Sequence, residues 1–109
     1  MLNNTKIEKK LEVSKFIELI SKCPKQQIEC TSHTFFRLSQ KQREIFNAEE
    51  LRKILLNEKP FLVGIQYNEN YAVFYRHQNK ILKLILGISN RKINIVTFYF
   101  IEEWQIPKI

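Results

Sequence analysis

Aspartate is absent from this sequence, and all eleven acidic residues are glutamates. Aspartate is the residue most used in tight carboxylate cages around magnesium or calcium, so a metal-dependent nuclease is not expected. Glycine occurs only twice and proline three times in 109 residues, which leaves no linker, no low-complexity tract and no glycine-rich phosphate loop. We therefore expect one domain over residues 1–109 that uses no metal or other cofactor.

Cysteines and long apolar runs are scarce as well. Two cysteines, Cys23 and Cys30, are too few for a disulfide scaffold or for a four-ligand zinc site. Free cysteine is often buried, so two buried thiols are expected, with one bridge between them as the alternative. No apolar run reaches the roughly 18 residues of a membrane span, and the first residues lack the apolar segment of a signal peptide. These absences predict a cytoplasmic protein with no membrane partner.

Positive charge and apolar side chains are what the sequence has instead. The formal net charge is +7, and hydrophobic residues make up 44% of the chain, with 12% aromatic. This apolar content is that of a globular protein, because disordered chains are poor in aromatic and branched apolar residues. The positive field favours a polyanionic partner, either a nucleic acid or an acidic protein.

An N-terminal helix is expected over residues 5–23. Thr5 and Glu8 make a capping box, apolar residues with helical spacing share one side, and Pro24 ends the pattern. The following residues 26–31 are compatible with either a short extended segment or a loop.

Two short helices are expected over residues 32–58. In the first, His33 and Arg37 lie four positions apart on the polar side, opposite apolar residues with helical spacing. The second begins at Asn47, because a capping residue followed three positions later by Glu50 is a typical helix start. It ends before a proline, since the residue that precedes proline disfavours the helical conformation.

Residues 60–101 change to a period of two. Four runs rich in β-branched and aromatic residues are separated by short turn-like segments, which leave no room for crossover helices. This pattern predicts a four-stranded antiparallel meander, followed by a tail over residues 102–109. The expected fold class is α+β, with the N-terminal helices packed on one face of that sheet.

The turns between the strands determine which side chains share a face of the sheet. Tyr75 is expected opposite Leu82, and Ile88 opposite Ile93. The face toward the helices then carries Phe61, Val63, Ile65, Val73, Leu84, Leu86 and Ile95. The other face carries Leu62, Gln66, Phe74, Arg76, Lys83, Asn94, Val96 and Phe98.

The second of these faces combines aromatic and basic side chains. Aromatic rings stack on unpaired bases and cations hold phosphates, so RNA is a candidate ligand. The candidate RNA-binding residues are Phe74, Arg76, Lys83 and Phe98. Such a face also suits a protein partner or a second copy of the chain, because exposed apolar patches mark interaction surfaces. A further alternative is that the N-terminal helix or the C-terminal tail folds back and covers it.

Cleavage of RNA without a metal needs a base, an acid and cations that stabilise the crowded phosphate. Histidine titrates in the right range for the first two roles, and His33 lies one helical turn from Arg37. The alternative is that His33 is a surface or capping residue near the start of a helix.

The order of these features resembles a known family. A helix with His-x-x-x-Arg, a second helix and a last strand that reads "INIVTFYFI" are similar to the small ribonuclease toxins of the RelE and BrnT type. These belong to the barnase, EndoU, colicin and RelE superfamily, and the likeness extends over residues 32–101. The sequence departs from the family pattern in three places. Its last strand lacks a dense cluster of arginine and lysine, and it carries a long N-terminal helix and a C-terminal tail.

The resemblance implies a metal-independent endoribonuclease that an antitoxin, expected to be an acidic protein, holds inactive. His33 and Arg37 match the helix motif, and Thr97 and Tyr99 match the last-strand motif. The catalytic roles that follow are acid or base for His33, phosphate binding for Arg37, and orientation of the scissile group for the other two. The register above, however, puts Thr97 and Tyr99 on the helix side and Arg76 on the other. The alternative function is a non-catalytic module that binds nucleic acid, a protein or a second copy of itself.

Overall fold

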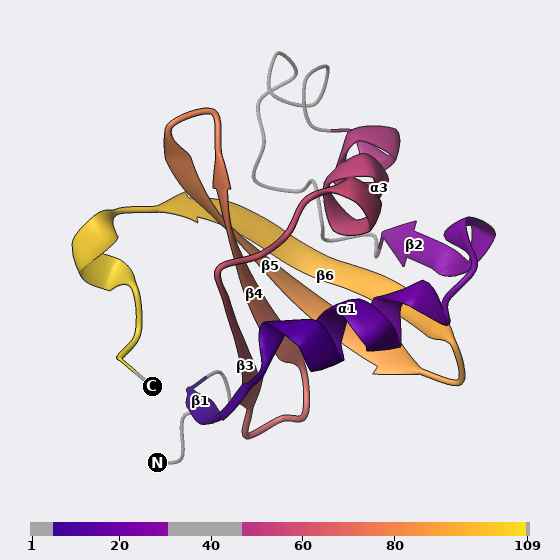
Figure 1. Cartoon of the computed structure of the whole chain (residues 1–109), viewed down its shortest axis with the longest axis horizontal. Coiled ribbons are helices and arrows are strands. Elements are labelled where there is room, and N and C mark those ends of the chain that lie inside the picture. The colour runs from indigo at the N-terminus through magenta and orange to yellow at the C-terminus, as the bar shows by residue number, and fades with distance from the viewer. Residues whose placement is uncertain (1–5, 31–46, 109) are drawn as a thin grey trace.

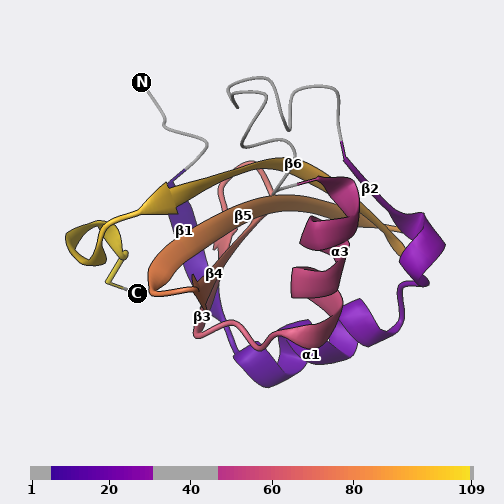
Figure 2. The same ribbon diagram turned by 90° about the horizontal axis from the view of Figure 1, so that it is seen from above.

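The computed structural model describes residues 6–30 and 47–108. These residues form one curved sheet of six strands, and two α-helices lie on its concave side (Figure 1, Figure 2). In chain order the elements are β1 (Ile7–Leu11), α1 (Val13–Ser21), the 3₁₀ turn η1 (Lys25–Gln27), β2 (Ile28–Cys30), α3 (Ala48–Asn57), β3 (Leu62–Gln66), β4 (Tyr71–His77), β5 (Lys80–Ser89), β6 (Lys92–Ile101) and the 3₁₀ turn η2 (Glu103–Gln105).

The sheet corrects the predicted fold class. Its strand order is β1-β3-β4-β5-β6-β2, with β2 parallel to β6 and the other neighbours antiparallel. The prediction of a four-stranded antiparallel α+β meander is therefore wrong, because the meander β3–β6 is extended at both edges into a mixed sheet. Strand β2 comes from the segment that was ambiguous in the sequence. It forms because Ile28 pairs with Ile93 of β6 and both side chains are fully buried.

The N-terminal helix is shorter than predicted. Residues Ile7–Leu11 are a strand, and the helix begins only at Val13. Leu11 pairs with Val63 of β3 at the edge of the sheet. Pairing with a neighbouring strand overrides weak local preference, so these residues form a strand. The proposed capping box fails for the same reason, since Glu8 lies within β1.

Helix α3 begins as the sequence predicted. The side-chain oxygen of Asn47 accepts a hydrogen bond of 2.9 Å from the backbone N–H of Glu50. The helix buries Leu51, Ile54 and Leu55 against the sheet. The other helix predicted in this part of the chain, over residues 32–46, lies outside the described residues.

We expect Asn47→Ala to lower the free energy of unfolding by about 1 kcal/mol, because the backbone N–H of Glu50 loses its capping acceptor. Urea unfolding followed by circular dichroism measures this change. Asn57→Ala, at the exposed end of the same helix, is the matched control and should change stability by less than about 0.5 kcal/mol. Equal effects of the two substitutions would show that the cap contributes nothing.

The two-residue hairpin turns define the register of the central strands. Gln78 and Asn79 have φ angles of 50° and 65°, and the Asn90–Arg91 turn has similar positive values. Paired residues of this kind form the primed turns that suit the twist of a hairpin. The predicted pairs Tyr75 with Leu82 and Ile88 with Ile93 are both confirmed.

A β-bulge in β6 then changes the register. Leu86 pairs with Ile95, but the preceding Ile85 pairs with Thr97, so Val96 is an extra residue. Because side chains alternate between the two faces, one extra residue exchanges the faces of all the residues that follow it. The predicted face of every residue from Thr97 to the end of β6 is therefore reversed.

Buried apolar side chains lie on both faces of the sheet. We call the side toward α1 and α3 the helix face; its core includes Phe16, Ile20, Leu51, Ile54, Leu55, Val73, Leu84, Leu86, Ile93 and Ile95. The opposite face has a smaller cluster of Leu62, Ala72, Phe74, Ile81 and Ile85. Ile106 of the C-terminal tail packs against this smaller cluster, so the tail covers part of the opposite face.

Two further predictions concern cysteines and membranes. Both thiols are free, with Cys23 buried and Cys30 half-buried, so the alternative of a bridge is wrong. Burial raises the pKa of both thiols above their ordinary value. In the part of the chain that the structure describes, no helix has the length and apolar character to cross a membrane.

Candidate nucleic-acid interface

Three side chains line up across the opposite face of the sheet. Phe74 of β4 pairs with Lys83 of β5, and Lys83 pairs with Tyr99 of β6. Directly paired residues project to the same side, so these three form a continuous line over three strands. The bulge at Val96 is what brings Tyr99 into this line.

Lys83 lies between two aromatic rings. Its ammonium nitrogen is 5.5 Å from the ring centre of Phe74 and 5.3 Å from that of Tyr99. Both distances are within the range of about 6 Å for cation–π attraction. Phe74 is fully buried, whereas Tyr99 is 44% exposed. The ammonium group of Lys83 therefore lies between the buried ring of Phe74 and the partly exposed ring of Tyr99.

The line continues toward Arg76 through a further ring, that of Phe61. The guanidinium carbon of Arg76 lies 4.7 Å from the centre of the Phe61 ring, and this ring is 6.3 Å from that of Phe74. We call Arg76, Phe61, Phe74, Lys83 and Tyr99 the cation–aromatic row. In this order, the rings of Phe61 and Phe74 lie between the two cations, and the ring of Tyr99 lies beyond Lys83.

The two cations of the row differ in whether a carboxylate pairs with them. The Nη1 atom of Arg76 donates a hydrogen bond of 2.6 Å to the Oε1 atom of Glu103 in η2. This bond raises the pKa of Arg76 above its ordinary value. By contrast, no carboxylate of residues 6–30 or 47–108 forms an ion pair with Lys83. Its ammonium hydrogens therefore remain available on this face to an anionic ligand.

The structure brings together most, but not all, of the residues singled out in the sequence. Phe74, Arg76 and Lys83 share one face, as predicted, and Thr97 lies on the same face opposite Ile85. Phe98 was assigned to this face wrongly. It pairs with Leu84, is 6% exposed and belongs to the core of the helix face.

His33 and Arg37, the two candidate catalytic residues of the predicted first helix, lie outside the described residues. Phe61, by contrast, belongs to the cation–aromatic row, although the sequence predicted its side chain to lie on the helix face. Phe61 precedes β3, and alternation along that strand does not determine the orientation of its side chain. The available signal in the sequence was an aromatic residue next to Pro60, but this signal did not indicate on which face of the sheet the side chain would lie.

His77, the second histidine, belongs to a different surface. It pairs with Lys80 across the β4–β5 turn, and its Nδ1 atom lies 3.1 and 3.2 Å from the two carboxylate oxygens of Glu58, after α3. The hydroxyl of Tyr75, on the same helix face, is buried, and burial with the nearby Glu58 charge raises its pKa. These groups are separated from the cation–aromatic row by the sheet.

Among known protein families, the model of the MJ0788 family matches residues 14–88. This segment runs from α1 to β5 and includes Phe61, Phe74, Arg76 and Lys83, whereas Tyr99 lies beyond it. No curated protein and no solved structure matches the chain.

Proposed function

The chain belongs to the MJ0788 family, and for this member we propose a metal-independent endoribonuclease of the toxin type that binds single-stranded RNA along the cation–aromatic row. The observation that carries this proposal is the bulge at Val96. It places Thr97 and Tyr99, which the last-strand motif singled out, on the same face as Lys83 and Arg76. Two independent sets of candidate residues thereby share one surface.

The row supplies the two contacts that single-stranded RNA requires. An unpaired base can stack on the exposed ring of Tyr99, and base stacking on an aromatic side chain contributes about 1 to 3 kcal/mol. The neighbouring phosphate can accept hydrogen bonds from the ammonium group of Lys83, which is 5.3 Å from that ring. The net charge of +7 draws the polyanion to the surface.

The proposed reaction is an internal transfer of the phosphoryl group. A base removes the proton of a ribose 2′-hydroxyl, whose oxygen attacks the adjacent phosphorus while the bond from phosphorus to the 5′-oxygen breaks. An acid returns a proton to that leaving oxygen, so the products are a 2′,3′-cyclic phosphate and a 5′-hydroxyl. In this proposal His33 is the acid or base, Arg37 binds the phosphate, and Thr97 and Tyr99 orient the scissile group.

The purified chain should cleave a single-stranded RNA in the presence of a metal chelator. The His33→Ala, Arg37→Ala double variant should lower the rate by about a hundredfold or more, because a positioned acid or base contributes at least that factor. His77→Asn, which changes the only other histidine, is the control and should retain cleavage. Intact RNA after incubation with the unmodified chain, or activity that the chelator abolishes, would contradict the proposal.

Inhibition by an acidic antitoxin and a location in the cytoplasm are parts of the same proposal. An acidic protein could cover Lys83 and Arg76 by charge complementarity and thereby exclude RNA. The expected consequence in bacteria is growth arrest with loss of messenger RNA when the chain is expressed alone. The double variant of His33 and Arg37 should relieve that arrest.

A non-catalytic RNA-binding module is the second candidate. It is favoured by one observation, which is that the described residues of the cation–aromatic row include no histidine or carboxyl group for proton transfer. The same cleavage experiment separates the two functions. A binding module would hold RNA with unchanged affinity in the double variant and would leave the RNA uncut.

A further inference from the structure

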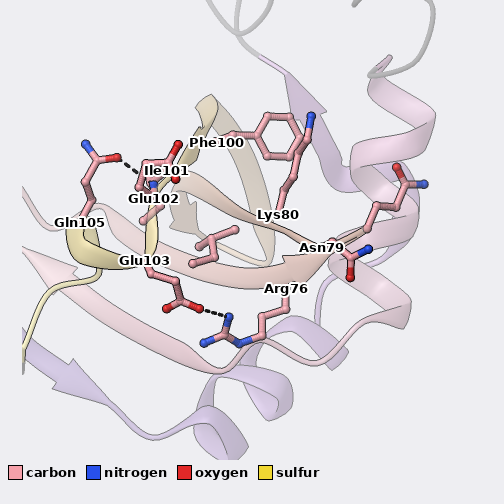
Figure 3. A pocket seen from close by; sticks show the side chains of 10 residues that line it. Arg76, Asn79, Lys80, Phe100, Ile101, Glu102, Glu103 and Gln105 are labelled. Atoms are coloured by element: carbon pink, nitrogen blue, oxygen red, sulfur yellow. Dashed lines mark hydrogen bonds and ion pairs between the residues drawn. The ribbon is translucent and has the colours of Figure 1, made fainter.

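The C-terminal turn η2 limits the opposite face of the sheet at the end where Arg76 lies. Glu102 and Gln105 stabilise this turn reciprocally, because the side chain of each accepts a hydrogen bond from the backbone N–H of the other. The turn holds the carboxylate of Glu103 against the guanidinium of Arg76 (Figure 3). An RNA strand bound at Lys83 therefore extends in the other direction, along β5 toward the β5–β6 turn.

A line of amide side chains crosses the opposite face at that other end. Gly87 of β5 pairs with Asn94 of β6. On the other side of Gly87 lies Asn70, because the residues next to these two form the last pair between β4 and β5. The residues that flank Gly87 and Asn94, and Tyr71 next to Asn70, pack in the core of the helix face. Asn70, Gly87 and Asn94 therefore share the opposite face.

The missing side chain of Gly87 leaves a gap between two asparagines. A methyl group at Gly87 would lie 3.6 Å from the Oδ1 atom of Asn70, so the side chain of Asn70 reaches over this position. Adjacent strands lie about 4.8 Å apart, so about 10 Å separates the backbones of Asn70 and Asn94. Both asparagines are half-buried, and neither side-chain amide hydrogen-bonds to another of the described residues. The two amides are therefore available to a ligand that lies over the glycine.

A buried amide lies next to this line. Gln66 of β3 donates its backbone N–H to the carbonyl oxygen of Asn70 at 2.8 Å. Its side chain belongs to the same face, since Leu62, four positions earlier in β3, is part of the smaller cluster. Gln66 is 2% exposed, and its Oε1 atom accepts no hydrogen bond from the residues that the structure describes. A buried acceptor without a donor is unfavourable, so a ligand with a donor group at this end of the face would stabilise it.

The chemistry of asparagine selects among the four bases of RNA. Each side-chain amide has an acceptor oxygen beside donor hydrogens, so it matches an edge that offers one donor and one acceptor. Adenine has two such edges, because its N6 amino group lies beside N7 on one side and beside N1 on the other. The corresponding N7 and O6 atoms of guanine are both acceptors, and each pyrimidine has a single edge of this kind. Adenine is therefore the base that two asparagines can bind together.

We propose that Gly87 is the floor of a subsite for one adenine of the bound RNA, in which the side-chain amides of Asn70 and Asn94 hydrogen-bond to two edges of the base. Lys83 lies four residues away on the same strand and face, which is about 13 Å at about 3.3 Å per residue, so one short RNA can reach both places. The inference rests on the proposed function and deepens it, because it gives the RNA a base preference that the cation–aromatic row does not provide.

Two RNA decamers test the preference by fluorescence anisotropy, one made of uridines and one with a single adenine at its centre. The unmodified chain should bind the adenine-containing decamer about tenfold more tightly, because a bidentate contact between an amide and a base discriminates to about that extent. Asn94→Ala should reduce the preference to about twofold or less. Asn57→Ala, an exposed asparagine of α3 on the other side of the sheet, is the matched control and should keep the full preference.

Gly87→Ala tests the floor of the subsite without removing an amide. The φ angle of Gly87 is not in the left-handed region, and the added methyl group would be in ordinary van der Waals contact with Asn70. The variant should therefore fold, which circular dichroism checks. We expect the preference for adenine to fall about fivefold or more, because the methyl group takes the space of the base. The affinity for the uridine decamer should stay unchanged.

The possible results separate the subsite from the proposed function. If the unmodified chain shows no preference for adenine, or if the preference persists in Asn94→Ala or in Gly87→Ala, the subsite is wrong. The proposed function still stands in that case if Lys83→Ala weakens binding and the RNA is cleaved. If the preference depends on Gly87 and Asn94 but the RNA remains uncut, the subsite stands and the proposed cleavage is wrong. Failure of the unmodified chain to bind either decamer overturns both.

Discussion

Lys83→Glu should weaken the binding of single-stranded RNA by about a hundredfold. The substitution removes one phosphate contact and places a negative charge between Phe74 and Tyr99, where the phosphate is expected. Like charges brought together at an interface cost several kcal/mol, and a hundredfold change corresponds to about 2.7 kcal/mol. Fluorescence anisotropy with a labelled RNA at one fixed salt concentration measures the effect.

The control for this experiment is Lys53→Glu. Lys53 is an exposed residue of α3, on the other side of the sheet, and its substitution changes the net charge by the same amount. Its effect should be small, because only the general attraction of the polyanion is reduced. If both substitutions weakened binding equally, net charge alone would explain the affinity, and the cation–aromatic row would not be the binding surface.

Phe98→Ala should lower the free energy of unfolding by about 4 kcal/mol. The bulge at Val96 turns Phe98 into the core of the helix face, where its side chain is 6% exposed. Loss of a buried phenylalanine side chain costs about 3 to 5 kcal/mol. Urea unfolding followed by circular dichroism provides the measurement.

Tyr99→Ala is the matched control, because the same bulge places Tyr99 on the opposite face, where its side chain is 44% exposed. Its cost should be about 1 kcal/mol or less, as for other truncations at exposed positions. A strand without the bulge would exchange the faces of these two residues, so a larger cost for Tyr99→Ala than for Phe98→Ala would contradict the register of β6. Such a result would also remove the structural basis for grouping Tyr99 with Lys83.

The parts of the fold that the sequence predicted correctly depend on local signals. Asn47 marks the start of α3 because its side chain caps the helix within one turn. The short turns at Gln78 and Asn90 define the register of the neighbouring strands, so the shared face of Phe74 and Lys83 followed from counting residues. These features need no knowledge of residues that are far away in the chain.

The parts that were wrong depend on contacts between distant residues. Strand β2 has only three residues, and Ile28 becomes a strand residue because Ile93 pairs with it. The bulge has no sequence signature either, because Val96 lies between β-branched residues that would fit either register. The sequence therefore predicted Phe98 on the opposite face and Tyr99 on the helix face, which is the reverse of their positions in the structure. For this reason the prediction separated Tyr99 from Lys83 and Arg76.

The two edge strands of the sheet have a consequence for the order of folding. Both come from residues 6–30, yet β1 pairs with β3 and β2 pairs with β6, the last strand that the structure describes. The second strand of this segment therefore has no partner until β6 has been translated. Contacts that join distant parts of a chain slow folding, because loops must close before those contacts form. Strand β2 is thus translated before the central strands, but its edge of the sheet forms only after them.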